Sequence, residues 1–405
     1  MAAIRSVRTG GRPIFRLYDF RMLPGGRARL SGVDGLRAIA ALSVFFCHLG
    51  AYWGIQGELP LKLGKASELG AHGVDLFVVI SGFCLALPVA RAGIGLNRVE
   101  FFIRRATRIL PPYYLALAGC AALAIIPATS HYVVGSRAGV ESVFTHAVVA
   151  QSLVPGQSGT INGSFWSVAL EVQLYLVFPL LVLAWRRFGL DRVVAVTAVA
   201  SLLWALLQPA HWWILGSTEV LPDRLVQFSA GALAASWLTA GRVPTRKLLW
   251  AGVIGGGAVA VAGSTANFDY GTTMLWTVPS VCIVLLGSTG FTHQAHGRAL
   301  VQLGVWSYSF YLLQQPVLLM TAPLAHRVTD SPMLLLFLGS TVCLALVVLG
   351  SWIMHRLVER PSIDLGARLV AARRARAAAE PVSVEPASTE LPIVDAAQPV
   401  LGTTG

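Results

Sequence analysis

Long apolar segments, each about as long as a membrane-spanning helix, limit what this chain can fold into. A helix needs about 20 predominantly apolar residues to cross a bilayer. Only 12% of the residues are charged, about half the share in a soluble globular protein, and the mean hydropathy is +0.66. We therefore predict an all-α, polytopic integral membrane protein with about ten transmembrane helices. The expected spans are residues 35–55, 70–90, 110–130, 165–187, 192–213, 220–240, 247–266, 273–291, 300–324 and 333–357.

Basic residues recur at every second connection between these spans. Arginines fill the segment before residue 30 and the connections after the second, fourth, sixth and eighth spans, whereas the alternate connections are nearly neutral. Because positively charged loops stay on the cytoplasmic side, we predict that both termini are cytoplasmic and that the protein lies in the plasma (inner) membrane. The net charge of +12 is spread along the chain, so we expect a lipid bilayer, and no nucleic acid, as its partner.

The chain divides into three regions. Residues 1–30 are predicted to form a basic cytoplasmic arm without a signal peptide, and residues 31–361 the transmembrane domain. Residues 362–405 are predicted to be a disordered cytoplasmic tail. Residues 140–153 are too short to span comfortably and are expected to form a partly embedded helix. The five cysteines lie in apolar runs without CxxC spacing, so we expect buried thiols, with no disulfide and no metal site.

The stretch DGLRAIAALSVFFCHLG at residues 34–50 places two ionisable groups within the first span. Arg37 and His48 are 11 residues apart, close to three helical turns, so they share a face about 16 Å apart along the axis. Because charged groups in a membrane are costly and usually mark function, we interpret this face as a substrate path. The alternatives are a snorkelling Arg37 and a His48 that is bonded to a neighbouring helix. The path hypothesis requires both side chains to open onto one cavity.

The second span, GAHGVDLFVVISGFCLAL, carries Asp75 at a predicted depth comparable with that of His48. A carboxylate bonded to the other imidazole nitrogen would orient His48 for proton abstraction. We therefore expect Asp75 to pair with His48. The alternative is that Asp75 simply lies near the outer aqueous surface.

Three arginines cluster in FFIRRATRILPPYY at residues 101–114, before the third span. Arg104, Arg105 and Arg108 could bind phosphates through bidentate hydrogen bonds. The alternatives are a topology anchor and a contact with anionic lipid.

The fourth span opens with INGSFWSVALEVQLY. Ser167, Glu171 and Tyr175 recur every four residues and share a helix face, and Trp166 is expected at the membrane interface. An unpaired glutamate is costly in lipid, so Glu171 is predicted to face the protein interior or a water-filled cavity.

The ninth span contains VWSYSFYLLQQP. It places Tyr308, Tyr311 and Gln315 along one side, with Gln314 beside them. Such side chains suit the hydroxyls of a sugar, and they suit interhelical hydrogen bonds equally well.

Six stretches of the chain, in this order, resemble the membrane-bound acyltransferase-3 family over residues 31–361: DGLRAIAALSVFFCH, GVDLFVVISGF, FFIRRATRILPPYY, NGSFWSVALEVQLY, YSFYLL and VERP. The resemblance implies a ten-helix enzyme that moves an acyl group, usually acetyl, from cytoplasmic acyl-CoA to a hydroxyl on a sugar or related acceptor. The family's Arg-x10-His motif falls on Arg37 and His48, and the histidine is regarded as catalytic. Its arginine motif falls on the 104–108 cluster and is implicated in coenzyme A binding. Relatives often carry a histidine where this chain has Gln314.

These observations combine into one hypothesis, a membrane O-acyltransferase of the O-acetyltransferase type. We expect acyl-CoA, most simply acetyl-CoA, as co-substrate, and a sugar or glycosylated small molecule as acceptor. A transporter or flippase of a lipid-linked saccharide would also need buried ionisable groups, and it is the competing hypothesis. The predicted catalytic residues are His48, Asp75 and Glu171; the predicted donor-binding residues are Arg37, Arg104, Arg105 and Arg108; the predicted acceptor-binding residues are Trp166, Ser167, Tyr175, Tyr308, Tyr311, Gln314 and Gln315.

Overall fold

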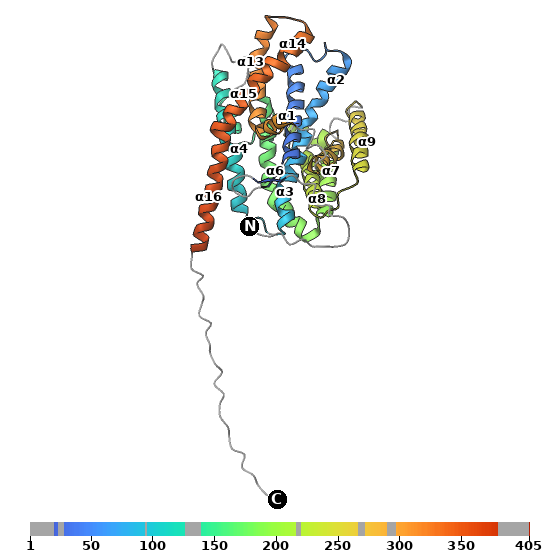
Figure 1. Cartoon of the computed structure of the whole chain (residues 1–405), viewed down its shortest axis with the longest axis vertical. Helices are drawn as coiled ribbons and strands as arrows, with labels where there is room; N and C mark the ends of the chain where they lie inside the picture. Colours follow the sequence, from blue (N-terminus) through green and yellow to red (C-terminus); the bar gives the residue numbers. More distant parts are fainter. Residues whose placement is uncertain are drawn as a thin grey trace.

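Helices account for almost all of the secondary structure in the computed structural model of this chain (Figure 1). The structure describes residues 20–22, 28–93, 95–125, 139–215, 220–265, 272–289, 297–379 and 405. The longer α-helices are α1 (Ser31–Tyr52), α3 (Gly73–Ala92), α4 (Arg98–Ile125), α6 (Trp166–Phe188), α7 (Leu190–Leu215), α8 (Leu221–Thr239), α9 (Arg246–Thr265), α11 (Thr277–Ser288), α13 (Ser307–His326), α15 (Leu344–Met354) and α16 (Arg360–Ala379). The shorter ones are α2 (Leu61–Leu69), α5 (Val140–Ala147), α10 (Thr272–Leu275), α12 (Arg298–Val305) and α14 (Pro332–Leu338).

Single helical turns and π-helical segments complete the helical part. They are the 3₁₀ turns η2 (Gly70–His72), η4 (Gln151–Leu153) and η5 (Gly163–Phe165), and the π-helices η6 (Gly339–Cys343) and η7 (His355–Glu359). Two short strands, β1 (Phe20–Met22) and β2 (Ala28–Leu30), pair antiparallel within the N-terminal arm, with Phe20 opposite Leu30. The predicted all-α class is confirmed, because this two-stranded ribbon is only a minor addition.

The protein is a multi-pass membrane protein by the length and composition of its helices. Within the described part of the chain, six helical segments are long and apolar enough to cross a membrane. Each of the ten predicted spans overlaps a helix. Several of those helices are too polar or too short to be counted among the six membrane-crossing segments. One example is α8, which has Asp223 and Arg224 near its start. The count of ten spans and the cytoplasmic location of the termini stay predictions.

Helices α3 and α8 pack closely against each other. A Cβ added to Gly82 of α3 would clash with the backbone oxygen of Phe228, and one added to Gly231 of α8 would clash with the backbone oxygen of Val79. Each helix therefore presents a glycine to the other's backbone, which is how helices approach closely in membranes. This contact fixes the first turns of α3 and α8 beside each other.

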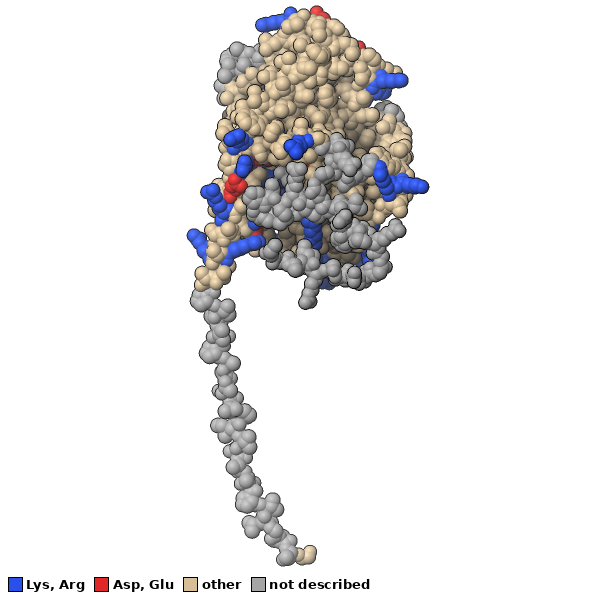
Figure 2. All heavy atoms as spheres, viewed as in Figure 1, with Lys and Arg blue, Asp and Glu red and all other residues tan. Residues whose placement is uncertain are grey.

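The predicted disordered tail is wrong over its first part, because residues 360–379 form α16, which extends beyond the bundle (Figure 1). This segment is rich in alanine, arginine and leucine, which have high helix propensity. It also gains tertiary contacts, since Gly366 packs on Thr107 of α4 and Arg374 binds Glu100 at 2.8 Å and 2.5 Å. Basic side chains gather on α16, while much of the surface above it in Figure 2 is uncharged. The rest of the predicted tail lies outside the described residues, apart from residue 405.

Candidate functional site

A cavity of about 100 Å³ lies between α1, α3, α4, α6 and α13. A single buried water needs about 10–15 Å³ by the same measure, so the cavity is large enough for several waters or part of a ligand. Its polar lining residues are Arg37, Ser81, Cys84, Arg105, Arg108, Ser167, Glu171, Ser307, Tyr308 and Tyr311.

The cavity carries an excess of positive charge. Arg37, Arg105 and Arg108 contribute three guanidinium groups, whereas Glu171 contributes one carboxylate. The Nε of Arg37 donates a hydrogen bond to the hydroxyl of Ser307 at 3.2 Å. The guanidinium groups can therefore bind an anion, and arginine suits phosphate in particular because of its bidentate geometry.

The predicted shared face of α6 is confirmed. Ser167 and Glu171 both line the cavity, and the Tyr175 hydroxyl donates a hydrogen bond to the Glu171 carboxylate. The guanidinium carbon of Arg105 lies 5.7 Å from the centre of the Tyr175 ring, so Tyr175 contacts a cation as well as the acid. Glu171 thus faces the protein interior, as expected, and lies in the same cavity as the arginines.

Helices α1 and α13 lie side by side and run parallel, with contacts at three successive levels. The contacts are a hydrogen bond from Arg37 to Ser307, a ring contact at 5.9 Å between Phe45 and Phe310, and a hydrogen bond of 3.0 Å from the Trp53 indole to the Leu318 carbonyl.

His48 lies between the second and third of these levels on α1, and Gln314 lies between the same two levels on α13. Equal rise per residue therefore places His48 and Gln314 at one level of the bundle. The His48 ring contacts that of Tyr52, with ring centroids 5.2 Å apart. A Cβ added to Gly163 would lie 3.2 Å from the Gln315 amide oxygen and 3.6 Å from the Tyr52 hydroxyl. These groups form a second polar region, further along α1 than the cavity.

The expectation that Arg37 and His48 open onto one cavity is wrong for this conformation. Arg37 lines the cavity, whereas His48 is absent from the described residues that line it. One turn before His48, Val44 packs with Val74 and Tyr311 in a small apolar cluster. This layer lies between the arginine-lined cavity and the level of His48.

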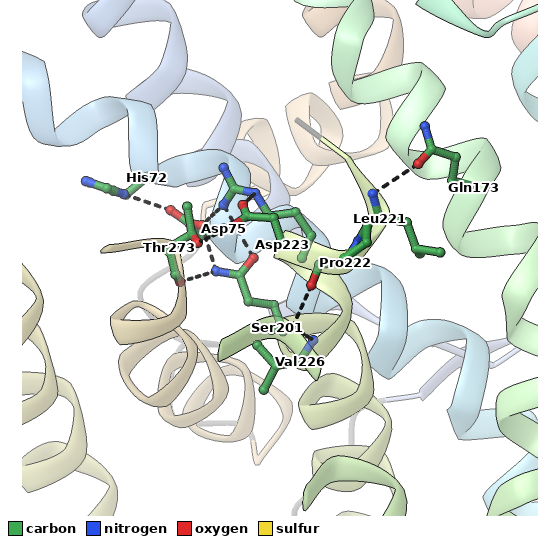
Figure 3. Close-up of polar contacts among 11 residues, drawn as sticks. His72, Asp75, Gln173, Ser201, Leu221, Pro222, Asp223, Val226 and Thr273 are labelled. Carbon is green, nitrogen blue, oxygen red and sulfur yellow. Dashed lines mark hydrogen bonds and ion pairs between the residues drawn. The ribbon is translucent and has the colours of Figure 1, made fainter. Parts of the chain in front are cut away.

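The predicted pairing of Asp75 with His48 is also wrong. The Asp75 carboxylate contacts the His72 ring nitrogen at 2.8 Å, accepts a hydrogen bond of 2.7 Å from Gln227, and forms an ion pair with Arg224 (Figure 3). Asp75 faces α8 because it lies on the side of α3 that packs there, rather than on the side next to α1. Within the described residues, the Nδ1 of His48 has no hydrogen-bond partner.

Sequence reasoning missed the remainder of this buried network. Arg224 also pairs with Asp223 at 3.3 Å, and Thr273 donates to Asp223 at 3.2 Å. The His72 ring stacks on Trp276, with centroids 4.1 Å apart. The adjacent charges in LPDRLVQF, inside a predicted span, were the signal that could have revealed it.

The other predicted site residues lie in different surroundings. Arg104 is not among the lining residues of the cavity, unlike Arg105 and Arg108. The Trp166 ring lies 5.9 Å from the guanidinium carbon of Arg224, so it contacts the buried network.

Two further predicted residues hold neighbouring segments together. Tyr308 lines the cavity and donates a hydrogen bond of 2.9 Å to the Ile109 carbonyl, which supports the interhelical alternative for this residue. Gln315 accepts a hydrogen bond of 3.1 Å from Ser164.

Comparison with known proteins places this geometry in a functional class. Residues 30–356 match the family described as "Acyltransferase domain". The chain is 25% identical to acyltransferase MdmB of Streptomyces mycarofaciens, over 91% of this chain and 99% of that protein. It is 28% identical to the exopolysaccharide production protein ExoZ of Rhizobium meliloti, over 79% of this chain and 98% of that protein. It is 29% identical to the putative peptidoglycan O-acetyltransferase YrhL of Bacillus subtilis, over 43% of this chain and 27% of that protein. No solved structure gives a significant match.

A membrane bundle with an arginine-lined cavity, together with these matches, defines an enzyme of the O-acyltransferase class. The chain belongs to the acyltransferase-3 family, whose domain covers most of its length.

Proposed function

We propose that the protein transfers an acyl group, most simply acetyl, from cytoplasmic acyl-CoA to a hydroxyl of a carbohydrate or glycosylated acceptor at the plasma (inner) membrane. The observation that carries this proposal is the cavity, which three guanidinium groups and one carboxylate line in a chain of the acyltransferase-3 family. The excess positive charge suits the phosphates of coenzyme A.

Binding of the donor follows from the cavity. Arg37, Arg105 and Arg108 hold the anionic part of acyl-CoA, while the apolar lining accommodates its uncharged arm. The rise of about 16 Å from Arg37 to His48 suits a thioester at the end of that arm. This route is closed by Val44, Val74 and Tyr311 in the described conformation. The proposal therefore requires a donor-bound conformation in which these side chains separate and the cavity extends to His48.

Transfer takes place at the level of His48. The imidazole accepts the proton of the acceptor hydroxyl while the hydroxyl oxygen bonds to the acyl carbon. The carbon–sulfur bond of the thioester breaks, and the His48 imidazolium gives the proton to the leaving thiolate, which regenerates the neutral imidazole. An acyl-histidine intermediate would divide the same reaction into two steps.

The acceptor is proposed from the polar and aromatic groups beyond the cavity and from the named relatives. Tyr52 and Gln315 offer hydrogen bonds near Gly163, at the level of His48. ExoZ is named for exopolysaccharide production and YrhL for peptidoglycan O-acetylation, so carbohydrates are the acceptors that the relatives favour.

Purified protein in proteoliposomes tests the proposal with radiolabelled acetyl-CoA and an added carbohydrate acceptor. We expect release of coenzyme A thiol, and a loss of about 10²- to 10⁴-fold in His48→Ala. His326→Ala is the matched control, because this histidine is 41% exposed and lies at the far end of α13. Uptake of label into vesicles without thioester cleavage would identify a transporter instead.

A further inference from the structure

Gln314 is a buried amide without hydrogen bonds. Its exposed fraction is 0%, and neither its amide oxygen nor its amide nitrogen has a partner among the described residues. The Nδ1 of His48, at the same level of the neighbouring helix, is likewise unpaired. An amide flip would not change this observation, since both amide atoms are unsatisfied.

The adjacent glutamine shows what a structural role looks like here. The amide oxygen of Gln315 accepts a hydrogen bond from Ser164 and so joins α13 to η5, although its amide nitrogen has no partner among the described residues. Gln314 makes no comparable bond to any described residue. Because buried polar groups in native proteins are normally satisfied by protein, water or ligand, its amide is available to a group that enters the site.

We propose that Gln314 stabilises the transition state of acyl transfer by donating a hydrogen bond from its amide nitrogen to the acyl carbonyl oxygen. The inference rests on the proposed function, because it requires a thioester beside His48. As the acceptor oxygen bonds to the acyl carbon and His48 takes its proton, negative charge develops on the carbonyl oxygen. The N–H of Gln314 faces that charge until the carbon–sulfur bond breaks and the carbonyl reforms.

The size of the expected effect follows from comparable donors. Removing one hydrogen-bond donor from an oxyanion site lowers kcat by about 10²- to 10³-fold. A donor that acts only on the transition state lowers kcat and leaves KM for acyl-CoA unchanged. A residue that only packs two helices together would instead reduce the amount of folded protein.

The experiment compares Gln314→Leu and Gln314→Glu with wild type in proteoliposomes, using radiolabelled acetyl-CoA as the probe and an added carbohydrate acceptor. Gln302→Leu is the matched control, because Gln302 is exposed on α12. We expect kcat for coenzyme A release to fall about 10²-fold in Gln314→Leu at neutral pH, and in Gln314→Glu wherever its carboxyl is ionised, with KM retained. Size-exclusion chromatography in detergent checks that each variant is folded and monodisperse.

The glutamate variant adds a pH signature that a structural role would not produce. Glutamate has nearly the shape of glutamine, but its ionised form cannot donate, and its protonated form can. Its activity relative to wild type should therefore rise as pH falls from about 8 to about 6, since burial favours the protonated carboxyl. Gln314→Leu should show a constant ratio.

The outcomes separate this inference from the proposed function. If wild type releases no coenzyme A, the proposed function fails. If release depends on His48 but is unchanged in Gln314→Leu, only the role of Gln314 is overturned. A glutamate variant whose activity stays as low as that of the leucine variant across the whole pH range would also overturn it.

Discussion

Two groups of buried polar residues, on opposite sides of the α1–α3 pair, differ in how completely they are satisfied. The Asp75 network on the α8 side links two carboxylates, a guanidinium, an amide and an imidazole through hydrogen bonds and ion pairs (Figure 3). Two of its atoms, the Oδ2 of Asp223 and the Nε of Arg224, have no hydrogen bond and are joined by an ion pair at 3.3 Å. On the α13 side, the Nδ1 of His48 and both amide atoms of Gln314 have no partner among the described residues. Both groups are costly to bury.

This difference distinguishes residues that hold helices together from residues that are available to a substrate. A satisfied network fixes the helices that carry it, and it offers few free polar atoms to a ligand. Unsatisfied groups lower stability unless water or substrate completes them. We infer that the Asp75 network holds α3 against α8, while the His48 level is where the substrate binds.

The largest expected effect on stability comes from breaking the Asp75 network. Arg224→Leu removes the cation that pairs with two buried carboxylates, and the loss of one partner from a buried ion pair costs about 3–5 kcal/mol. Thermal unfolding in detergent should show a large fall in Tm. His48→Ala leaves no charge uncompensated and should change Tm much less.

A double variant sharpens this test. Combining Asp75→Leu with Arg224→Leu removes a carboxylate together with the cation, so it should recover part of the lost stability. An Arg224→Leu protein that keeps its Tm but loses activity would show that the network binds substrate, and the contrast drawn above would be wrong.

A smaller effect is expected at the arginine-lined cavity. Arg108→Lys keeps the charge but loses bidentate geometry, so we expect KM for acyl-CoA to rise about tenfold with kcat little changed. Arg104→Lys is the matched comparison, since Arg104 does not line the cavity. Steady-state kinetics of coenzyme A release measures both variants. An equal rise of KM in both variants would mean that Arg104 also binds the donor, and no change in either would mean that the cluster acts through its charge alone.

Sequence could predict which site residues lie together when those residues belong to the same helix. Spacing by three or four residues placed Ser167 and Glu171 on one face of α6, and the structure confirms that face. Partners on different helices could not be predicted in this way. Asp75 and Arg224 are 149 residues apart, and nothing in the local pattern shows that α3 turns Asp75 toward α8 rather than toward His48.

For the fold as well, features set by the local sequence could be predicted, whereas features set by contacts between distant segments could not. The long apolar segments located the helices of the bundle, because a segment that crosses lipid must satisfy its own backbone hydrogen bonds and therefore forms a helix. The helix over residues 360–379 was missed because its sequence has no apolar periodicity, and its contacts with α4 come from a segment about 270 residues earlier.

The smallest expected effect concerns this peripheral helix and its ion pair with α4. Glu100 is buried, whereas Arg374 is 67% exposed, and the hydrogen bond from Arg374 holds the pKa of the Glu100 carboxyl below its ordinary value. A carboxyl with a lowered pKa stabilises the folded state above its ordinary pKa, and this stabilisation is lost as pH falls through the lowered value. The protection factors of the α16 amides, which are corrected for the pH dependence of intrinsic exchange, should therefore be high at neutral pH and fall only in acid. Glu100→Gln should lower them at neutral pH without changing coenzyme A release, because neither Glu100 nor Arg374 lines the cavity. A fall in activity with this variant would instead tie α16 to the site and break the distinction between the periphery and the arginine-lined cavity.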